Sequence, residues 1–358
     1  MRSGNTAYIE RLDHLRFYAA ALVLLFHAWL LIGGATRAIH QISIINQGQV
    51  GVQLFMVISG FILAIISYDK ELSALRFYLN RALRIYPLFL VVLALGYFAT
   101  PDPRPTSTAI DFLIAALPTS NLSRLSYGEF GGQLWSIAVE LQFYLLFPFL
   151  HMMLARRGPR YHLSLLAFLV GMRAAVFLLH GTVYDLSYFS LFGCLDVFLI
   201  GHLSGWAYRR GALHLERPPW VLGATLAICI LIWTADRMHF FDHDSALWII
   251  WPDVLAVAFA VLVPAYIQCS APIPFSASLA ALGRWSYSIY LWHIAIILIM
   301  QRLHLSDLNP YLFGCLVLPV TVAIAAASYH IIERPFLEWR VKYTAPKQND
   351  TALQVAAE

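Results

Sequence analysis

Long apolar stretches separated by short polar segments run through the whole chain. A helix needs about 20 mostly apolar residues to cross the hydrocarbon core of a membrane. Stretches of this kind cover, approximately, residues 15–33, 50–68, 85–100, 133–154, 162–181, 188–208, 219–235, 246–267, 285–303 and 311–333. The pattern predicts an all-α integral membrane protein with about ten transmembrane helices. Residues 110–117 are apolar but too few to cross, so we expect them to lie on the membrane surface.

Composition supports this fold class. Apolar residues make up 60% of the 358 positions and charged residues 12%, whereas a soluble domain carries about 25% charged residues. A net charge of +4 without a basic stripe argues against a nucleic-acid partner. The four cysteines are widely spaced, which predicts neither a zinc site nor a disulfide framework. The first apolar stretch contains His27 and no small-residue cleavage pattern, so we interpret it as a span and not as a signal peptide.

Lysine and arginine residues concentrate in alternate polar segments. If the N-terminus is cytoplasmic, the cytoplasmic segments hold 18 of the 24, the outer segments hold five, and Arg173 falls inside a span. Basic residues favour the cytoplasmic side of a membrane, so both termini are predicted to be cytoplasmic. We expect residues 1–345 to form one transmembrane domain and residues 346–358 to form a short disordered tail.

Six ionisable residues fall inside the predicted spans, where each costs about 2.5–3.5 kcal/mol on insertion scales. They are His27, Glu140, Arg173, Asp196, Asp253 and His293. At a rise of 1.5 Å per residue, three of them lie about 9–10 Å below the outer ends of their helices. These three, His27, Glu140 and Asp253, are predicted to gather in the outer half of the bilayer. The alternative is that each is an unrelated polar side chain satisfied by a neighbouring helix.

Helical spacing relates several of the charged residues. Arg16 and His27 are separated by nearly three turns, so they share one helix face, roughly 16 Å apart along the axis. Arg173 and Asp196 lie level on adjacent antiparallel helices, which predicts a salt bridge. Close packing of helices is the expected role of Gly60, which follows Ser59 in the second span.

Arg81 and Arg84 share a helix face at the predicted cytoplasmic surface. Arginine forks bind phosphate groups, although the ordinary excess of basic residues on the cytoplasmic side would also explain them. A metal site is conceivable in the outer loop. Its ligands would be His239, Asp242, His243 and Asp244. Their spacing is not that of a typical metal site, so no metal is predicted.

Six segments, taken in order, resemble motifs of membrane acyltransferase family 3. They are Arg16 followed after ten residues by His27, residues 51–61, residues 81–87 with Arg81, Arg84 and Pro87, residues 135–144 with Trp135, Ser136 and Glu140, residues 287–293 ending at His293, and residues 332–335. The matches extend over residues 12–336, nearly the whole chain. One position departs from the pattern: the arginine motif often begins with paired arginines, and here Asn80 precedes Arg81. Arg76 could supply the missing cation.

The resemblance implies transfer of an acyl group, commonly acetyl from acetyl-CoA, to a hydroxyl of a cell-envelope glycan or lipid-linked saccharide at the bacterial cytoplasmic membrane. Acyl-CoA would be a co-substrate, and no tightly bound cofactor is implied. We expect His27 to act as the base, because its ordinary pKa is near neutral. Glu140 would orient the imidazole or share its proton, Arg16 would complete the catalytic set, and Arg81, Arg84 and Arg76 would hold the CoA phosphates.

Other functions remain open at this point. A transporter is the main alternative, since buried Arg, Asp and His residues also line ion pathways, but the sequence contains no internal duplication. A channel or a structural membrane protein would leave the shared face of Arg16 and His27 unexplained. Many members of the family carry a fused domain of the SGNH-hydrolase type. This sequence ends about 25 residues after its last predicted span, so we expect direct acylation of the acceptor or a separate periplasmic partner.

Overall fold

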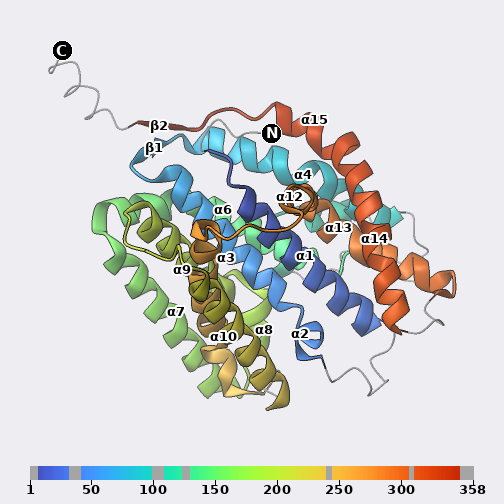
Figure 1. Ribbon diagram of the computed structural model, residues 1–358, viewed down its shortest axis with the longest axis horizontal. Helices are drawn as coiled ribbons and strands as arrows, with labels where there is room; N and C mark the ends of the chain where they lie inside the picture. The colour runs from blue at the N-terminus through green and yellow to red at the C-terminus, as the bar shows by residue number, and fades with distance from the viewer. Residues whose placement is uncertain are drawn as a thin grey trace.

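Helices account for nearly all of the structure (Figure 1). The computed structural model describes residues 7–31, 42–98, 109–122, 130–238, 244–305 and 310–346. In chain order the elements are α1 (Glu10–Leu31), α2 (Ser43–Asn46), α3 (Val50–Ser67), β1 (Lys70–Leu72), α4 (Ala74–Phe98), α5 (Ala109–Ala115), η1 (Ser120–Leu122), α6 (Trp135–Arg157), α7 (Pro159–His180), α8 (Tyr184–Phe189), α9 (Leu191–Arg209), α10 (Pro218–Arg237), η2 (Ala246–Ile249), α11 (Trp251–Gln268), α12 (Ser276–Arg284), α13 (Ser286–Arg302), α14 (Pro310–Ser328), the π-helical turn η4 (Tyr329–Glu333), α15 (Arg334–Glu338) and β2 (Thr344–Pro346).

The predicted fold class is confirmed. Within the described ranges, nine helices are long and apolar enough to cross a membrane, and the bent pair α12–α13 makes a tenth if it counts as one span. The two helices of that pair meet at 66°. Each of the ten predicted stretches overlaps one of these helices. Large apolar side chains such as Phe168, Leu178 and Trp233 are exposed on α7 and α10, as expected of surfaces that face lipid.

The third span differs from its prediction. The apolar stretch at 85–100 looked short for a transmembrane helix, but α4 begins at Ala74 and runs for 25 residues to Phe98. Arg81 and Arg84 therefore belong to the span itself. The seven-residue helix α5 is too short to cross, as predicted, and its Phe112 ring packs 5.4 Å from that of Phe98.

Glycines allow α3 and α9 to pack closely at the centre of the bundle. A Cβ atom at Gly60 would lie 2.1 Å from the carbonyl oxygen of Phe198, and one at Gly201 would lie 2.2 Å from that of Val57. Gly205, four residues after Gly201, is equally tight against α3. Small residues at this spacing let helix backbones approach in a membrane, where packing drives helix association. The expected packing role of Gly60 is confirmed.

A buried arginine joins α7, α9 and α11. Arg173 on α7 is fully buried, and its guanidinium lies 2.5 Å from Asp196 on α9, which confirms the predicted salt bridge. The same guanidinium also bonds Asp253 on α11. The prediction that Asp253 gathers with His27 and Glu140 is therefore wrong. Asp253 pairs with the guanidinium of Arg173, because intramembrane charges pair.

The C-terminal segment is attached to the beginning of α4. Strands β1 and β2 pair in antiparallel fashion, with Lys70 opposite Pro346 and Leu72 opposite Thr344. Both strands and α15 lie at one end of the bundle, with α2 and α8 toward the other (Figure 1). Pro346, the first residue of the predicted tail, belongs to β2, and residues 347–358 lie outside the described ranges.

The N-terminal and C-terminal residues of the described chain lie together at the end of the bundle that carries β1 and β2. Tyr8 and Arg340 line one cavity there. A chain whose two termini lie on the same side of a membrane crosses it an even number of times. This supports ten spans, with the bent pair α12–α13 counted as one of them.

The orientation can be tested with reporter fusions. Because basic residues concentrate at the end that carries β1 and β2, we expect that end to be cytoplasmic. A reporter that is active only outside the cytoplasm should be active when fused after Ser120 and inactive when fused after Arg157. The reverse pattern would contradict the orientation.

The Arg173 cluster generates a stability prediction. Arg173→Met leaves Asp196 and Asp253 buried beside each other without a cation, and breaking a buried ion pair costs about 3–5 kcal/mol. We expect a large fall in thermal stability in detergent. A matched variant that combines Arg173→Met with Asp196→Asn and Asp253→Asn removes the stranded charges and should recover most of the loss. An Arg173→Met protein as stable as the wild type would show that the cluster is not structural.

Candidate active site

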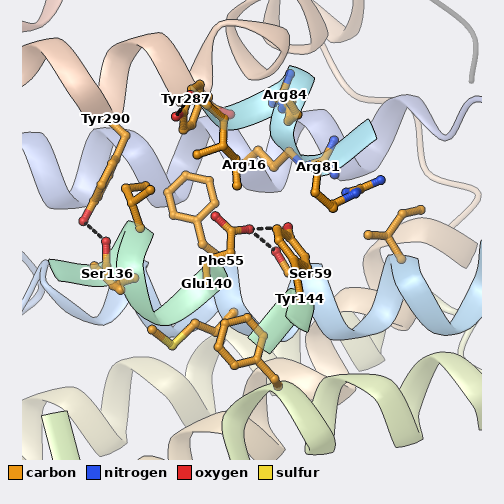
Figure 2. Close-up of a pocket in the computed structure, with 17 residues that line it drawn as sticks. Arg16, Phe55, Ser59, Arg81, Arg84, Ser136, Glu140, Tyr144, Tyr287 and Tyr290 are labelled. Atoms are coloured by element: carbon orange, nitrogen blue, oxygen red, sulfur yellow. Dashed lines mark hydrogen bonds between the residues drawn. The ribbon is translucent and has the colours of Figure 1, made fainter. Parts of the chain in front are cut away.

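A cavity lies between α1, α3, α4, α6, α9 and α13 (Figure 2). Apolar side chains such as Phe55 form part of its wall, and the rest is polar. The polar lining comprises Arg16, Ser59, Arg81, Arg84, Ser136, Glu140, Tyr144, Ser286, Tyr287 and Tyr290. Residues from six helices, far apart in the sequence, thus converge on one space.

A second cavity adjoins the first at the β1–β2 end of the bundle. The two share Arg16, Arg81 and Arg84 in their walls. The second cavity adds Arg284 and Arg340, so five guanidinium groups surround the passage from this end of the protein to its interior. We refer to these five residues as the arginine mouth. An arrangement of this kind attracts anions, and arginine forks match phosphate oxygens in particular.

Arg81 and Arg84 project from α4 three residues apart, on the same helix face. The Arg81 guanidinium lies 5.3 Å from the ring centroid of Tyr144 and 5.4 Å from that of Phe77. Its Nε atom is buried and has no hydrogen-bond partner in the described part of the chain. A buried donor without a partner is costly, so this nitrogen is a natural contact for a bound anion.

Arg84 is held differently. It lies 5.5 Å from the ring centroid of Tyr287 and 3.8 Å from the carboxylate of Glu333. Glu333 ends the π-helical turn η4 and also accepts a hydrogen bond from Ser288. The carboxylate and the ring fix the direction of Arg84 and leave it in the walls of both cavities.

Arg16 stands where the two cavities join. Asp13, in the first turn of α1, accepts a 2.8 Å hydrogen bond from Arg16 and another of 2.8 Å from Tyr8. The Asp13 side chain is buried, so it holds the guanidinium in one direction. Arg16 remains partly exposed and lines both cavities.

Asn80, the departure from the arginine motif, has a structural role. Its side chain is buried, donates to the carbonyl of Val341 at 2.6 Å and accepts from the backbone N–H of Val341 at 2.9 Å. The clamp places Arg340 in the arginine mouth. Burial, together with Arg84 and Arg81, lowers the pKa of Arg340 to about 10, so it remains a cation at neutral pH. Arg76, by contrast, is exposed and lines neither cavity.

The inner part of the first cavity is a network of hydroxyl groups around one carboxylate (Figure 2). Ser136, Glu140 and Tyr144 follow one another at four-residue intervals, which places them on one face of α6. Glu140 accepts from Tyr144 at 2.5 Å and from Ser59 on α3 at 3.1 Å. Tyr290 on α13 lies 2.6 Å from the Ser136 hydroxyl.

His27 lies beyond Tyr290, at the interface of α1 and α13. Its partner there is His293: Nε2 of His293 is 3.2 Å from Nδ1 of His27, and the ring centroids are 4.9 Å apart. Nδ1 of His27 also lies 2.9 Å from the carbonyl oxygen of Val23. The Tyr290 ring is 5.5 Å from that of His293 and lines the first cavity, so one aromatic residue separates the histidine pair from the cavity.

The structure thus brings together only part of the predicted set. Arg16, Glu140, Arg81 and Arg84 share one cavity, but among the described residues its lining does not include His27. The predicted contact between Glu140 and the His27 imidazole is wrong: Glu140 bonds Ser59 and Tyr144. The suggested metal ligands at 239–243 lie outside the described ranges.

Several residues at the site were not assigned a role from the sequence, among them Tyr290, His293 and Arg340. A signal for two of them was present. Tyr287, Tyr290 and His293 recur at three-residue intervals, which predicts one polar face on an otherwise apolar helix. Arg340 had no comparable signal, because its position depends on the distant contact of Asn80 with Val341.

Comparison with known proteins agrees with this geometry. Residues 9–330 match the acyltransferase 3 family, described as an acyltransferase domain. O-acetyltransferase OatA of Staphylococcus aureus strain NCTC 8325 / PS 47 is 26% identical over 360 residues, which covers 92% of this chain and 57% of OatA. OatA of strain COL matches to the same extent.

The chain therefore spans little more than half the length of these relatives. No solved structure matches it. The family match covers most of the sequence and every span except the end of the last one. This chain therefore belongs to the acyltransferase 3 family of multi-pass membrane proteins.

Proposed function

We propose that the protein moves an acyl group, acetyl in the first instance, from acyl-CoA at the cytoplasmic face of a bacterial membrane to a hydroxyl of a cell-envelope glycan. The observation that carries the proposal is the arginine mouth, which leads from one end of the bundle to a buried polar cavity. A transporter would also need a polar interior, but membership of an acyltransferase family favours group transfer. The name of the OatA relatives supports acetyl as the group and oxygen as the acceptor atom.

The donor fits the two cavities in one direction. CoA carries a diphosphate and a third phosphate on its nucleotide end, and a thioester at the end of a flexible arm. The phosphates would lie in the arginine mouth, where Arg81, Arg84 and Arg340 come from α4 and from the segment before β2. The arm would pass Arg16 and bring the thioester to the hydroxyl groups of Ser136 and Tyr290.

The acceptor would approach from the opposite side. A sugar hydroxyl is a weak nucleophile and needs a base that is largely neutral near pH 7, which is the chemistry of histidine. His27 is the titratable residue of α1 closest to the outer end of the span, and Tyr290 separates its partner His293 from the donor cavity. Donor and acceptor would therefore meet at Tyr290 and the histidine pair, with Glu140 holding the network behind the thioester through Tyr144 and Ser59.

Replacement of the arginines tests the donor site. Arg81→Ala, Arg84→Ala and Arg340→Ala should each raise the Kd for CoA by about tenfold or more, since a hydrogen bond to a charged group is worth about 1.5–3 kcal/mol. Binding of CoA to the purified protein measures this by titration calorimetry. The matched control is Arg334→Ala, because Arg334 is exposed and pairs with Glu338 on the same end of the protein. If all three variants bind CoA as the wild type does, the arginines serve only to orient the protein in the membrane.

Replacement of His27 tests the base. His27→Gln keeps the size and hydrogen bonding of the side chain but cannot take up a proton, so transfer should fall by about 10²–10⁴-fold while CoA binding is retained. The measurement is turnover of acetyl-CoA with a glycan acceptor. Near-normal turnover by the His27→Gln protein would rule out the proposed base.

A further inference from the structure

The hydrogen bonds of His293 fix which of its ring nitrogens carries a proton. A carbonyl oxygen can only accept a hydrogen bond. Nδ1 of His293 lies 2.5 Å from the carbonyl oxygen of Tyr290, so Nδ1 carries a hydrogen and donates it. His293 is fully buried, and the nearest titratable group is another histidine, so a positive charge on it would be costly. A neutral imidazole has one N–H, which leaves Nε2 of His293 as an acceptor.

The same reasoning fixes the tautomer of His27. Its Nδ1 faces two acceptors, the carbonyl oxygen of Val23 at 2.9 Å and Nε2 of His293 at 3.2 Å. Nδ1 therefore carries the hydrogen and donates to both. In the part of the chain that the structure describes, both hydrogen-bond contacts of His27 involve Nδ1. The lone pair of the ring is consequently on Nε2, the nitrogen that is left to accept a proton.

We infer that His293 is a positioning residue, which keeps His27 in the tautomer that has its lone pair on Nε2 and stabilises the imidazolium form during transfer. The inference rests on the function proposed above. It assigns to a histidine the part that a carboxylate plays in many base-activated sites, where a third group orients the imidazole. It also explains why Glu140 can be committed to Tyr144 and Ser59 without leaving His27 unsupported.

The proton balance of the reaction follows directly. The acceptor hydroxyl gives its proton to Nε2 of His27, and its oxygen forms a bond to the carbonyl carbon of the thioester. The carbon–sulfur bond breaks, the sulfur leaves with the electron pair, and it takes the proton back from Nε2. The products are the O-acyl ester and free CoA. Throughout the cycle the Nδ1 hydrogen stays on His27 and donates to His293, and this bond is stronger while His27 is charged.

Two conservative variants separate positioning from packing. His293→Gln places its carbonyl oxygen near the position of Nε2, where it can still accept from His27. His293→Asn places its amide near the position of Nδ1, where it can bond Tyr290 but does not reach His27. We expect the Gln variant to retain kcat within a few-fold. The Asn variant should lose about 10–100-fold in kcat, the loss seen when a group that orients a metal-bound histidine is removed, with the KM for acyl-CoA unchanged in both.

Each outcome decides the question. Normal kcat in the Asn variant, or equal losses in both variants, would overturn the positioning role. If His27→Gln is inactive in that case, the proposed function still stands, whereas absence of transfer by the wild type would overturn the function itself.

A measurement on the wild type avoids any dependence on folding of the variants. In protein with ¹⁵N-labelled histidine, the signals lost in His27→Gln identify the His27 nitrogens. The inference requires a protonated Nδ1 and an unprotonated Nε2, and the opposite assignment would contradict it.

Discussion

Every polar group inside the bundle needs a partner from the protein, because lipid provides none. Arg173 meets this requirement with two carboxylates and the carbonyl oxygen of Gly193, and it lines neither of the two cavities, so it stabilises the packing of α7, α9 and α11. Glu140 satisfies it with two hydroxyl groups, but in the wall of a cavity. Within the described ranges Arg81 and Arg173 each have a buried Nε without a hydrogen-bond partner, but only Arg81 lies in the walls of the two cavities. Position relative to the cavities therefore distinguishes the structural charge of Arg173 from the charges of Glu140 and Arg81.

Much of the fold follows from the apolar pattern, because a membrane imposes a minimum length on each span and favours basic residues on one side. Both the ten stretches and the pair of Arg173 with Asp196 could be predicted in this way. Depth along separate helices was a poorer guide. It placed His27, Glu140 and Asp253 at one level in the membrane. Whether two side chains at one level are neighbours depends also on the rotation of each helix about its own axis and on the order of the helices around the bundle. Asp253 consequently pairs with Arg173, and Glu140 faces α3 instead of α1.

The site was predictable where its residues share a helix. Spacing alone relates Arg81 to Arg84 and Ser136 to Glu140 and Tyr144. It does not reveal contacts between segments that are more than 200 residues apart, such as His27 with His293 or Asn80 with Val341. Those two contacts supply the parts that complete the site, a partner for the proposed base and a further cation for the arginine mouth. Together they give a site with the first cavity on one side of Tyr290 and a histidine pair on the other.

The central claim is that donor and acceptor reach this site from opposite faces of the membrane. This claim can be tested with sealed membrane vesicles and acetyl-CoA that is labelled in its acetyl group. Acetyl-CoA does not cross the membrane. In inside-out vesicles the cytoplasmic face is outermost, so added acetyl-CoA should label glycan enclosed in the lumen. In right-side-out vesicles the same addition should give no labelling until the vesicles are opened. Labelling of glycan by sealed right-side-out vesicles alone would contradict the account.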